Sequence, residues 1–199
     1  MKNNKTMLVI IAIVVLIAIA ITLCTFNISA PSNASRQYFC DYHHVSFDMN
    51  INVEDMDGNK LYNIDGEVFA TYEDDLTMTD NNGNIVKHTN DIYNLITQNE
   101  HAIYNSDNEL LYKCDGKIKI FADSYDIYDS DGNKIAYVNF NMFDTRGIMT
   151  DVNGNTIARY DSALSRKDYI LSIYENCKID DESVLMIFAS YVSDVRADG

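Results

Sequence analysis

Apolar and polar residues alternate along much of the chain, and this period of two is typical of β-strands with one buried face. The clearest example is residues 45–54, where Val, Phe, Met, Ile and Val alternate with Ser, Asp, Asn, Asn and Glu. Clusters of Gly, Asn and Asp are centred on residues 57–59, 82–84, 107–108, 131–133 and 153–155. These residue types tolerate the positive φ that tight hairpin turns require. Their regular recurrence therefore predicts an antiparallel meander of short strands.

An internal duplication accompanies these turns. Residues 57–66 resemble residues 107–116, with Leu-Tyr and Asp-Gly pairs at matching places 50 residues apart. Repeats of this kind indicate hairpin units that share one core. Twelve to fourteen candidate strands fit between Val45 and Tyr174. A meander of that length tends to close because closure removes unpaired edges, so we expect a mainly β fold, a closed antiparallel barrel of about 12 strands.

The C-terminal element breaks this pattern. An acidic stretch precedes the apolar run Val184–Val192, and Arg196 follows it. Acidic residues favour the start of a helix and a basic residue favours its end, so a helix over residues 181–196 is predicted. Most of the run is apolar on every side of such a helix, which is too short to span a membrane and must be buried all round. A helix at the centre of the barrel satisfies both conditions, and a further strand at residues 184–188 is the alternative.

The first 26 residues contain a long apolar segment. Residues 6–26 carry no charge, and as a helix these 21 residues would be about 31 Å long, close to the roughly 30 Å of a hydrocarbon core. Lys2 and Lys5 precede the segment, and the acidic bulk of the chain follows it. We expect a single transmembrane helix in the cell membrane, with residues 1–5 in the cytoplasm and the C-terminal domain on the extracytoplasmic side.

Other interpretations of this segment stay open. A cleaved signal peptide usually has a shorter apolar region of about 7–15 residues, although the small residues Ser32 and Ala34 would suit a peptidase. A lipoprotein signal ending at Cys24 would follow the bulky Leu23, where such signals have a small residue. Both routes also place the domain beyond the membrane. A buried helix of a soluble core is disfavoured because no amphipathic pattern is present.

The polar residues 27–44 are interpreted as a stalk, and residues 45–199 as the barrel domain with its helix. The high content of Asn, Lys, Ile, Asp and Tyr is typical of AT-rich bacterial genomes, so a bacterial source is expected.

Charge narrows the range of partners. The chain has 15 Lys and Arg against 30 Asp and Glu, a net charge of −15. Nucleic-acid phosphates require a positive surface, so nucleic-acid binding is excluded. Simple electrostatic adhesion to anionic lipid is disfavoured for the same reason. Contact with the membrane is expected through residues 6–26.

No residue is predicted to be catalytic, to bind a cofactor or to ligate a metal. The segment Asp129–Asn133 suggests a calcium loop, but an EF-hand loop has Gly sixth and Glu twelfth. Here Gly is fourth and Phe140 is twelfth, so a hairpin turn is predicted. Weak Ca²⁺ binding by looser carboxylate clusters stays open. Residues 40–44 (Cys-Asp-Tyr-His-His) lack a second Cys or His pair at zinc spacing, since His88 and His101 are isolated.

Motifs for covalent chemistry are missing as well. The chain contains no Gly-x-Ser-x-Gly sequence and no Gly-rich phosphate loop. Carboxylate pairs such as Asp74-Asp75 carry no specificity in so acidic a chain. Cys40, Cys114 and Cys177 follow the apolar segment and allow one disulfide in any of three pairings.

Several stretches resemble the LURP-one-related family, which belongs with the phospholipid scramblases to the tubby C-terminal-like superfamily. They are residues 125–138 (YDIYDSDGNKIAYV), 151–159 (DVNGNTIAR), 169–174 and the closing helix that ends in Asp-Val-Arg. The resemblance covers residues 45–197 and implies the same barrel around a C-terminal helix. Tubby domains hold phosphoinositides with basic residues, and scramblases carry a cysteine-rich acylated segment; neither feature is found in this sequence.

We therefore expect a membrane-anchored, non-enzymatic binding or regulatory protein whose ligand is an envelope lipid, glycan or protein. A structural or assembly partner of another membrane protein is one alternative. An enzyme with an unrecognised site in the barrel mouth is the other.

Overall fold

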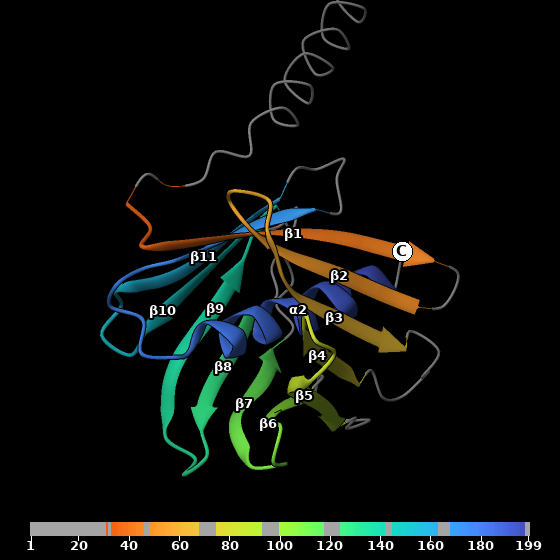
Figure 1. Cartoon of the computed structure of the whole chain (residues 1–199). Coiled ribbons are helices and arrows are strands. Elements are labelled where there is room, and N and C mark those ends of the chain that lie inside the picture. Colours follow the sequence, from red (N-terminus) through yellow and green to blue (C-terminus); the bar gives the residue numbers. More distant parts are fainter. Residues whose placement is uncertain are drawn as a thin grey trace, which may run out of the picture.

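The computed structural model describes residues 31, 33–45, 48–67, 75–92, 100–117, 124–141, 145–162 and 168–197. In this part of the chain twelve strands form one closed antiparallel barrel, and a C-terminal helix runs through it (Figure 1). Each strand pairs with its neighbours in sequence, and β1 pairs with β12 to close the barrel. The elements are β1 (Arg36–Val45), β2 (Asp48–Asp55), β3 (Lys60–Glu67), β4 (Leu76–Asp80), β5 (Ile85–Ile92), β6 (Glu100–Asn105), β7 (Leu110–Lys117), β8 (Ser124–Asp129), β9 (Lys134–Phe140), β10 (Arg146–Asp151), β11 (Thr156–Ser162), β12 (Tyr169–Ile173) and α2 (Asp181–Ala197).

The predicted barrel and its C-terminal helix are confirmed, but the predicted domain start at residue 45 is wrong. Strand β1 begins at Arg36, so residues 36–44 of the predicted stalk belong to the barrel wall. This strand pairs with both β2 and β12, and without it the barrel would be open. The alternating stretch at residues 45–54 is also divided, because β2 begins only at Asp48.

Five hairpin turns gather at one end of the barrel, and they follow the predicted spacing. In each turn the Asp or Asn that ends a strand accepts backbone N–H groups of the turn. Its C=O accepts the N–H three residues further on, and its side-chain oxygen accepts the N–H four residues further on. We call this end the hairpin end and the opposite end the loop end. The five turns comprise residues 56–59, 81–84, 106–109, 130–133 and 152–155.

The third residue of each turn has a positive φ, so its substitution should have a measurable energetic cost. It is Gly in four turns and Asn108, with φ 62°, in the other. Gly132 has φ 82°, and a Cβ there would meet no atom within 4 Å. Gly132→Ala should therefore lower the free energy of unfolding by about 1 kcal/mol through backbone strain alone. Gly132→Asn should cost less, as Asn108 indicates, and an equal loss in both thermal unfolding curves would contradict this explanation.

Helix α2 and a group of aromatic rings occupy the axis of the barrel. Every residue from Ser183 to Ser193 is at most 3% exposed, which explains why this segment is apolar on all sides. The ring of Phe140 on β9 stacks on Tyr191, and Tyr160 on β11 stacks on Phe188. The barrel interior around α2 is therefore packed with side chains, and ligands must be sought elsewhere.

Candidate functional site

Asp180 lies at the hairpin end of the barrel, just before α2. Its carboxylate accepts the Ser183 N–H at 3.0 Å and the Ser183 hydroxyl at 2.9 Å, which caps the helix. Lys87 on β5, whose side chain is 10% exposed, places Nζ 2.9 Å from Asp180 Oδ1. Burial disfavours the charge on Asp180, but hydrogen bonds from Lys87 and Ser183 outweigh it and hold the pKa of this carboxyl below its usual value.

The next two acidic residues, Asp181 and Glu182, are bound by side chains of β1 and β3. Arg36 Nε lies 2.6 Å from Asp181 Oδ2, and the Tyr38 hydroxyl donates to the same oxygen at 2.5 Å. The Tyr62 hydroxyl donates to Glu182 Oε1 at 2.6 Å. Burial, then the hydrogen bonds to these carboxylates, raises the pKa of both tyrosines far above the usual value, so both are neutral donors. The contacts of α2 with Arg36, Tyr38, Tyr62 and Lys87 are called the collar, and they fix the helix within the barrel.

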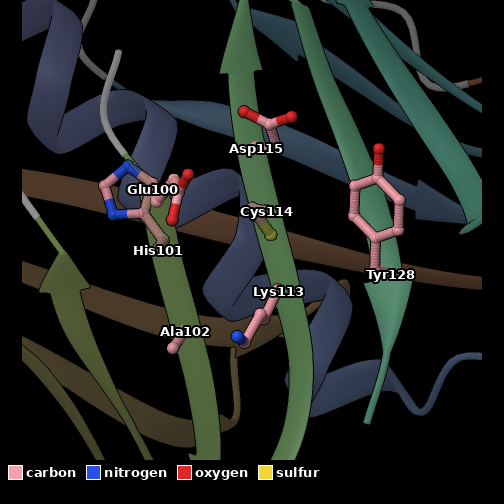
Figure 2. Close-up of a pocket in the computed structure, with 7 residues that line it drawn as sticks. All are labelled: Glu100, His101, Ala102, Lys113, Cys114, Asp115 and Tyr128. Atoms are coloured by element: carbon pink, nitrogen blue, oxygen red, sulfur yellow. The ribbon is translucent and has the colours of Figure 1, made fainter. Parts of the chain in front are cut away.

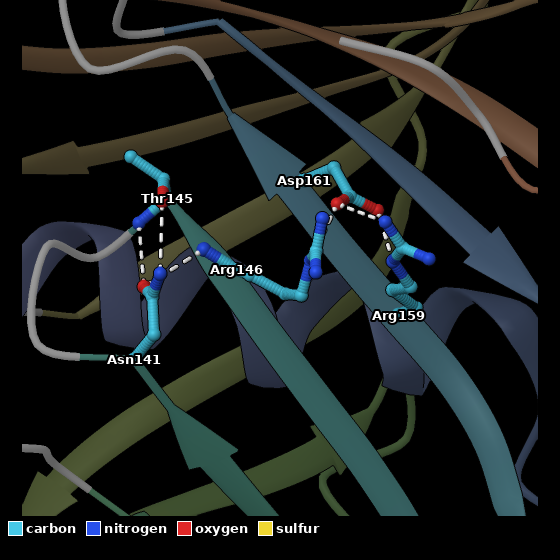
Figure 3. A network of polar contacts seen from close by, with 5 residues as sticks. All are labelled: Asn141, Thr145, Arg146, Arg159 and Asp161. Atoms are coloured by element: carbon cyan, nitrogen blue, oxygen red, sulfur yellow. Dashed lines mark hydrogen bonds and ion pairs between the residues drawn. The ribbon is translucent and has the colours of Figure 1, made fainter. Parts of the chain in front are cut away.

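A second polar cluster lies at the loop end, on β10 and β11 (Figure 3). Asp161, whose side chain is 8% exposed, accepts from Arg146 Nε at 3.1 Å and from Arg159 Nη2 at 2.6 Å. Asn141 Oδ1 accepts the backbone N–H groups of Thr145 and Arg146 and so holds the start of β10. Both hydrogen bonds end on Oδ1, and the bond from Arg146 ties β10 to β11. Arg159 Nε lies 2.6 Å from Oδ2 in an ion pair.

The outer wall carries a hollow of about 240 Å³ on β6, β7 and β8 (Figure 2). Glu100 lies directly opposite Asp115, and Lys113 lies between Ala102 and Tyr128 across the strands. Ala102 has no exposed surface, and its short side chain leaves room at the floor. The residues that line the hollow are Glu100, His101, Ala102, Lys113, Cys114, Asp115 and Tyr128.

The hollow combines acceptors and donors around a small floor. Glu100 and Asp115 are acceptors when ionised, the Lys113 ammonium is a donor, and the Tyr128 hydroxyl is both. Two like charges directly opposite each other on a sheet are unfavourable, so a donor placed between these carboxylates would relieve their repulsion. A volume of about 240 Å³ is below the roughly 300–1,000 Å³ of drug-sized sites. The hollow therefore suits one hydroxyl-rich or amine-bearing group, the size of a single sugar.

The structure places Cys40 and His43 on different faces of β1. Cys40 is buried in the core, while His43 is exposed and lies 2.7 Å from Asp41 Oδ2. Neighbouring strand residues point to opposite faces, so Cys40 and His43 cannot share a metal ion. Within the described ranges, no three His, Cys, Asp or Glu side chains are grouped as metal ligands.

In the described part of the chain, no disulfide joins Cys40, Cys114 and Cys177, and Cys40 and Cys114 are buried. Burial raises the pKa of the Cys40 thiol to about 12, so it stays protonated. Burial also raises the pKa of Cys177.

Asp129, the first residue of the suspected calcium loop, belongs to a hairpin turn, as predicted. Its Oδ1 accepts the Asn133 N–H at 2.8 Å and its Oδ2 accepts Asn133 Nδ2 at 3.1 Å. The side-chain bond from Asn133 is the largest cause that lowers the pKa of this carboxyl. Both oxygens therefore serve the turn rather than an ion.

The residues of the hollow were missed in the sequence. They come from three strands, and their proximity depends on the pairing of Glu100 with Asp115 and of Lys113 with Tyr128. The one available signal was the equal 50-residue offset, which aligns Asp65-Gly66 with Asp115-Gly116. Both pairs lie within strands, β3 and β7.

The predicted transmembrane segment, residues 6–26, lies outside the described residues. Among the residues that are described, no helix has both the length and the apolar character needed to cross a bilayer.

Comparison with known proteins gives a likeness of fold. No family model matches the chain, and no curated protein matches it. The X-ray structure of a protein from Arabidopsis thaliana superimposes with a TM-score of 0.57 at 12% sequence identity. The match covers 85% of this chain and 98% of the plant protein. The chain therefore shares the fold of that plant protein.

Proposed function

We propose that this protein is a membrane-anchored, non-enzymatic binding domain that presents the hollow on β6–β8 to a ligand outside the cytoplasm. The packed interior carries this proposal. Because α2 and its aromatic neighbours fill the barrel axis, a ligand of the described part of the domain has to bind to the outer wall. Residues 6–26 serve as the single transmembrane helix, with the N-terminus in the cytoplasm.

We also propose a distant relationship to the LURP-one-related family. The fold of the Arabidopsis thaliana protein and the repeated Asp-x-x-Gly-Asn turns followed by a buried helix support it. Lipid binding of the tubby type is not carried over, because it uses basic residues and this chain has a net charge of −15.

The chemistry of the hollow favours a sugar of an envelope glycan as the ligand. A sugar hydroxyl or amine donates to Glu100 and Asp115, and Lys113 or Tyr128 donates to a sugar oxygen. Tyr128 also offers an aromatic face on the rim (Figure 2). A lipid headgroup phosphate would instead meet two carboxylates at the same place.

Ligand-observed NMR of the full chain in detergent tests this function with glucosamine, N-acetylglucosamine and glucose as probes. The double variant Glu100→Gln, Asp115→Asn should weaken binding of the best probe at least tenfold, since charge-assisted hydrogen bonds are lost. The matched control, Asp57→Asn with Asp107→Asn, removes the same charge from two exposed turns and should bind as the wild type does. Equal weakening in both variants, or binding of no probe, would contradict the proposal.

A further inference from the structure

The N-terminal segment joins the barrel at the hairpin end. The backbone N–H and the hydroxyl of Ser35 each donate to the Ile173 carbonyl at 2.9 Å, and Gln37 Nε2 donates to the Pro31 carbonyl at 3.0 Å. The chain is thus attached to the barrel from Pro31 onward. Strand β1 starts beside the end of β12, on the side of the barrel where the hairpin turns lie (Figure 1).

Only a short tether separates this attachment from the apolar segment. Four residues, 27–30, lie between Phe26 and Pro31. Five residue steps span at most about 18 Å when fully extended. If residues 6–26 cross the bilayer, the hairpin end is held within that distance of its surface, and the loop end cannot be turned toward it.

Exposed apolar side chains are concentrated at the same end. Among the described residues four large hydrophobic side chains are exposed, and three of them lie at the hairpin end: Met56 (53%), Ile85 (53%) and Val152 (60%). Met56 and Val152 occupy the same position, the first after the aspartate, in the β2–β3 and β10–β11 turns. At that position the other three turns have Asn81, Ser106 and Ser130.

The two apolar turns are the hairpins next to the attachment point. In the barrel order β2 adjoins β1, and β11 adjoins β12, so Met56 and Val152 flank the place where the N-terminal segment joins. Ile85 starts β5, on the neighbouring hairpin beside Met56. Apolar tips are therefore found where the tether brings the barrel nearest to the bilayer.

We infer that the hairpin end docks on the bilayer that holds the anchor, with Met56 and Val152 in its interface and Ile85 beside them. The inference rests on the proposed membrane anchor and adds an orientation to it. Carboxylates such as Asp57 and Asp131 share this end, so the contact is shallow and favours zwitterionic over anionic lipid. The hollow, built near the loop end of β6–β8, then faces away from the membrane, where an envelope ligand can reach it.

The chain contains no tryptophan, so a single introduced Trp reports on one position alone. Met56→Trp, Val152→Trp and, as a loop-end control, the exposed Asn90→Trp are prepared in the full chain and reconstituted into phosphatidylcholine vesicles. Brominated phosphatidylcholine, which quenches Trp on contact, should dim the Trp at 56 and at 152 several-fold more than the Trp at 90. Replacing part of the lipid with phosphatidylglycerol should reduce that difference.

Flotation of the same vesicles tests membrane anchoring separately from docking of the hairpin end. Variants that float with the vesicles but show equal quenching at all three positions would overturn the docking inference and leave the anchor intact. Stronger quenching at position 90 would overturn it as well, since the loop end would then face the lipid. Failure of the wild type to float would contradict the anchor itself, and with it both the proposed function and the orientation.

Discussion

Phe188→Ala is expected to lower the free energy of unfolding by about 3–5 kcal/mol, the usual cost of removing a buried aromatic ring. Phe188 has no exposed surface. Its ring lies 5.9 Å, centroid to centroid, from both Tyr160 and Phe140. Neither neighbour can close the gap freely, because both belong to paired strands of a closed barrel. Urea unfolding of the full chain in detergent, followed by circular dichroism, measures the loss.

Phe39→Ala is the matched control. It removes the same ring from β1, where Phe39 is only partly buried, so less apolar surface returns to water and less of a cavity forms. We expect a loss below about 2 kcal/mol from the smaller area alone. If the two variants were equally destabilised, Phe188 would not be the centre of the core.

The crowding around Phe188 also explains Gly147 on β10. A Cβ at this position would stand 2.5 Å from Phe140 Cε1 and 3.1 Å from a Phe188 ring carbon. Gly147 allows the barrel wall to lie close to these two aromatic rings, whereas the turn glycines allow a positive φ. The sequence shows both kinds of glycine without distinguishing them.

The hairpins, the barrel and the buried helix were predictable because each depends on local pattern. An Asp-x-x-Gly-Asn sequence forms its turn through bonds within five residues, as Asp129 and Asn133 show. The helix over residues 181–196 was visible from its acidic start and its apolar faces, and the structure places it at Asp181–Ala197. Closure followed from the number of strands, since an open sheet would leave two edges.

The features that could not be predicted are those that depend on how the strands pair. Strand β1 (RQYFCDYHHV) places Cys40 and Tyr42 on its buried face, and a strand with so polar a composition resembles a stalk until its partners are known. The hollow depends likewise on the register that sets Glu100 opposite Asp115. Register is fixed by turn geometry and by the hydrophobic pattern, and each of the five strand pairs at the hairpin end contains one register shift beside its turn. A one-residue error in counting would move each of these side chains to the other face.

The collar predicts the second large effect. Asp180→Ser keeps a capping oxygen but leaves the Lys87 ammonium, on a side chain 10% exposed, without its carboxylate. A charge left nearly buried and unpaired costs about 2–3 kcal/mol. Lys87→Met combined with Asp180→Ser removes that charge while keeping a chain of similar length, and should restore most of the stability. A double variant no more stable than Asp180→Ser would show that the loss comes from the cap and not from the ion pair.

The ion pair of Asp180 and Lys87 makes part of the folding stability depend on pH. The pKa of Asp180 is lower in the folded chain than its ordinary 3.8, so its stabilising contribution is complete above that value and is lost as the pH falls through the folded pKa. Turn aspartates such as Asp80, whose pKa hydrogen bonds from Asn84 lower to about 2, titrate in the same direction and remain in every variant. The informative quantity is therefore the difference in unfolding free energy between wild type and Asp180→Ser. It should be constant from pH 7 to about pH 5 and shrink below about pH 4; a difference independent of pH would mean that the Asp180 charge does not hold the helix in the barrel.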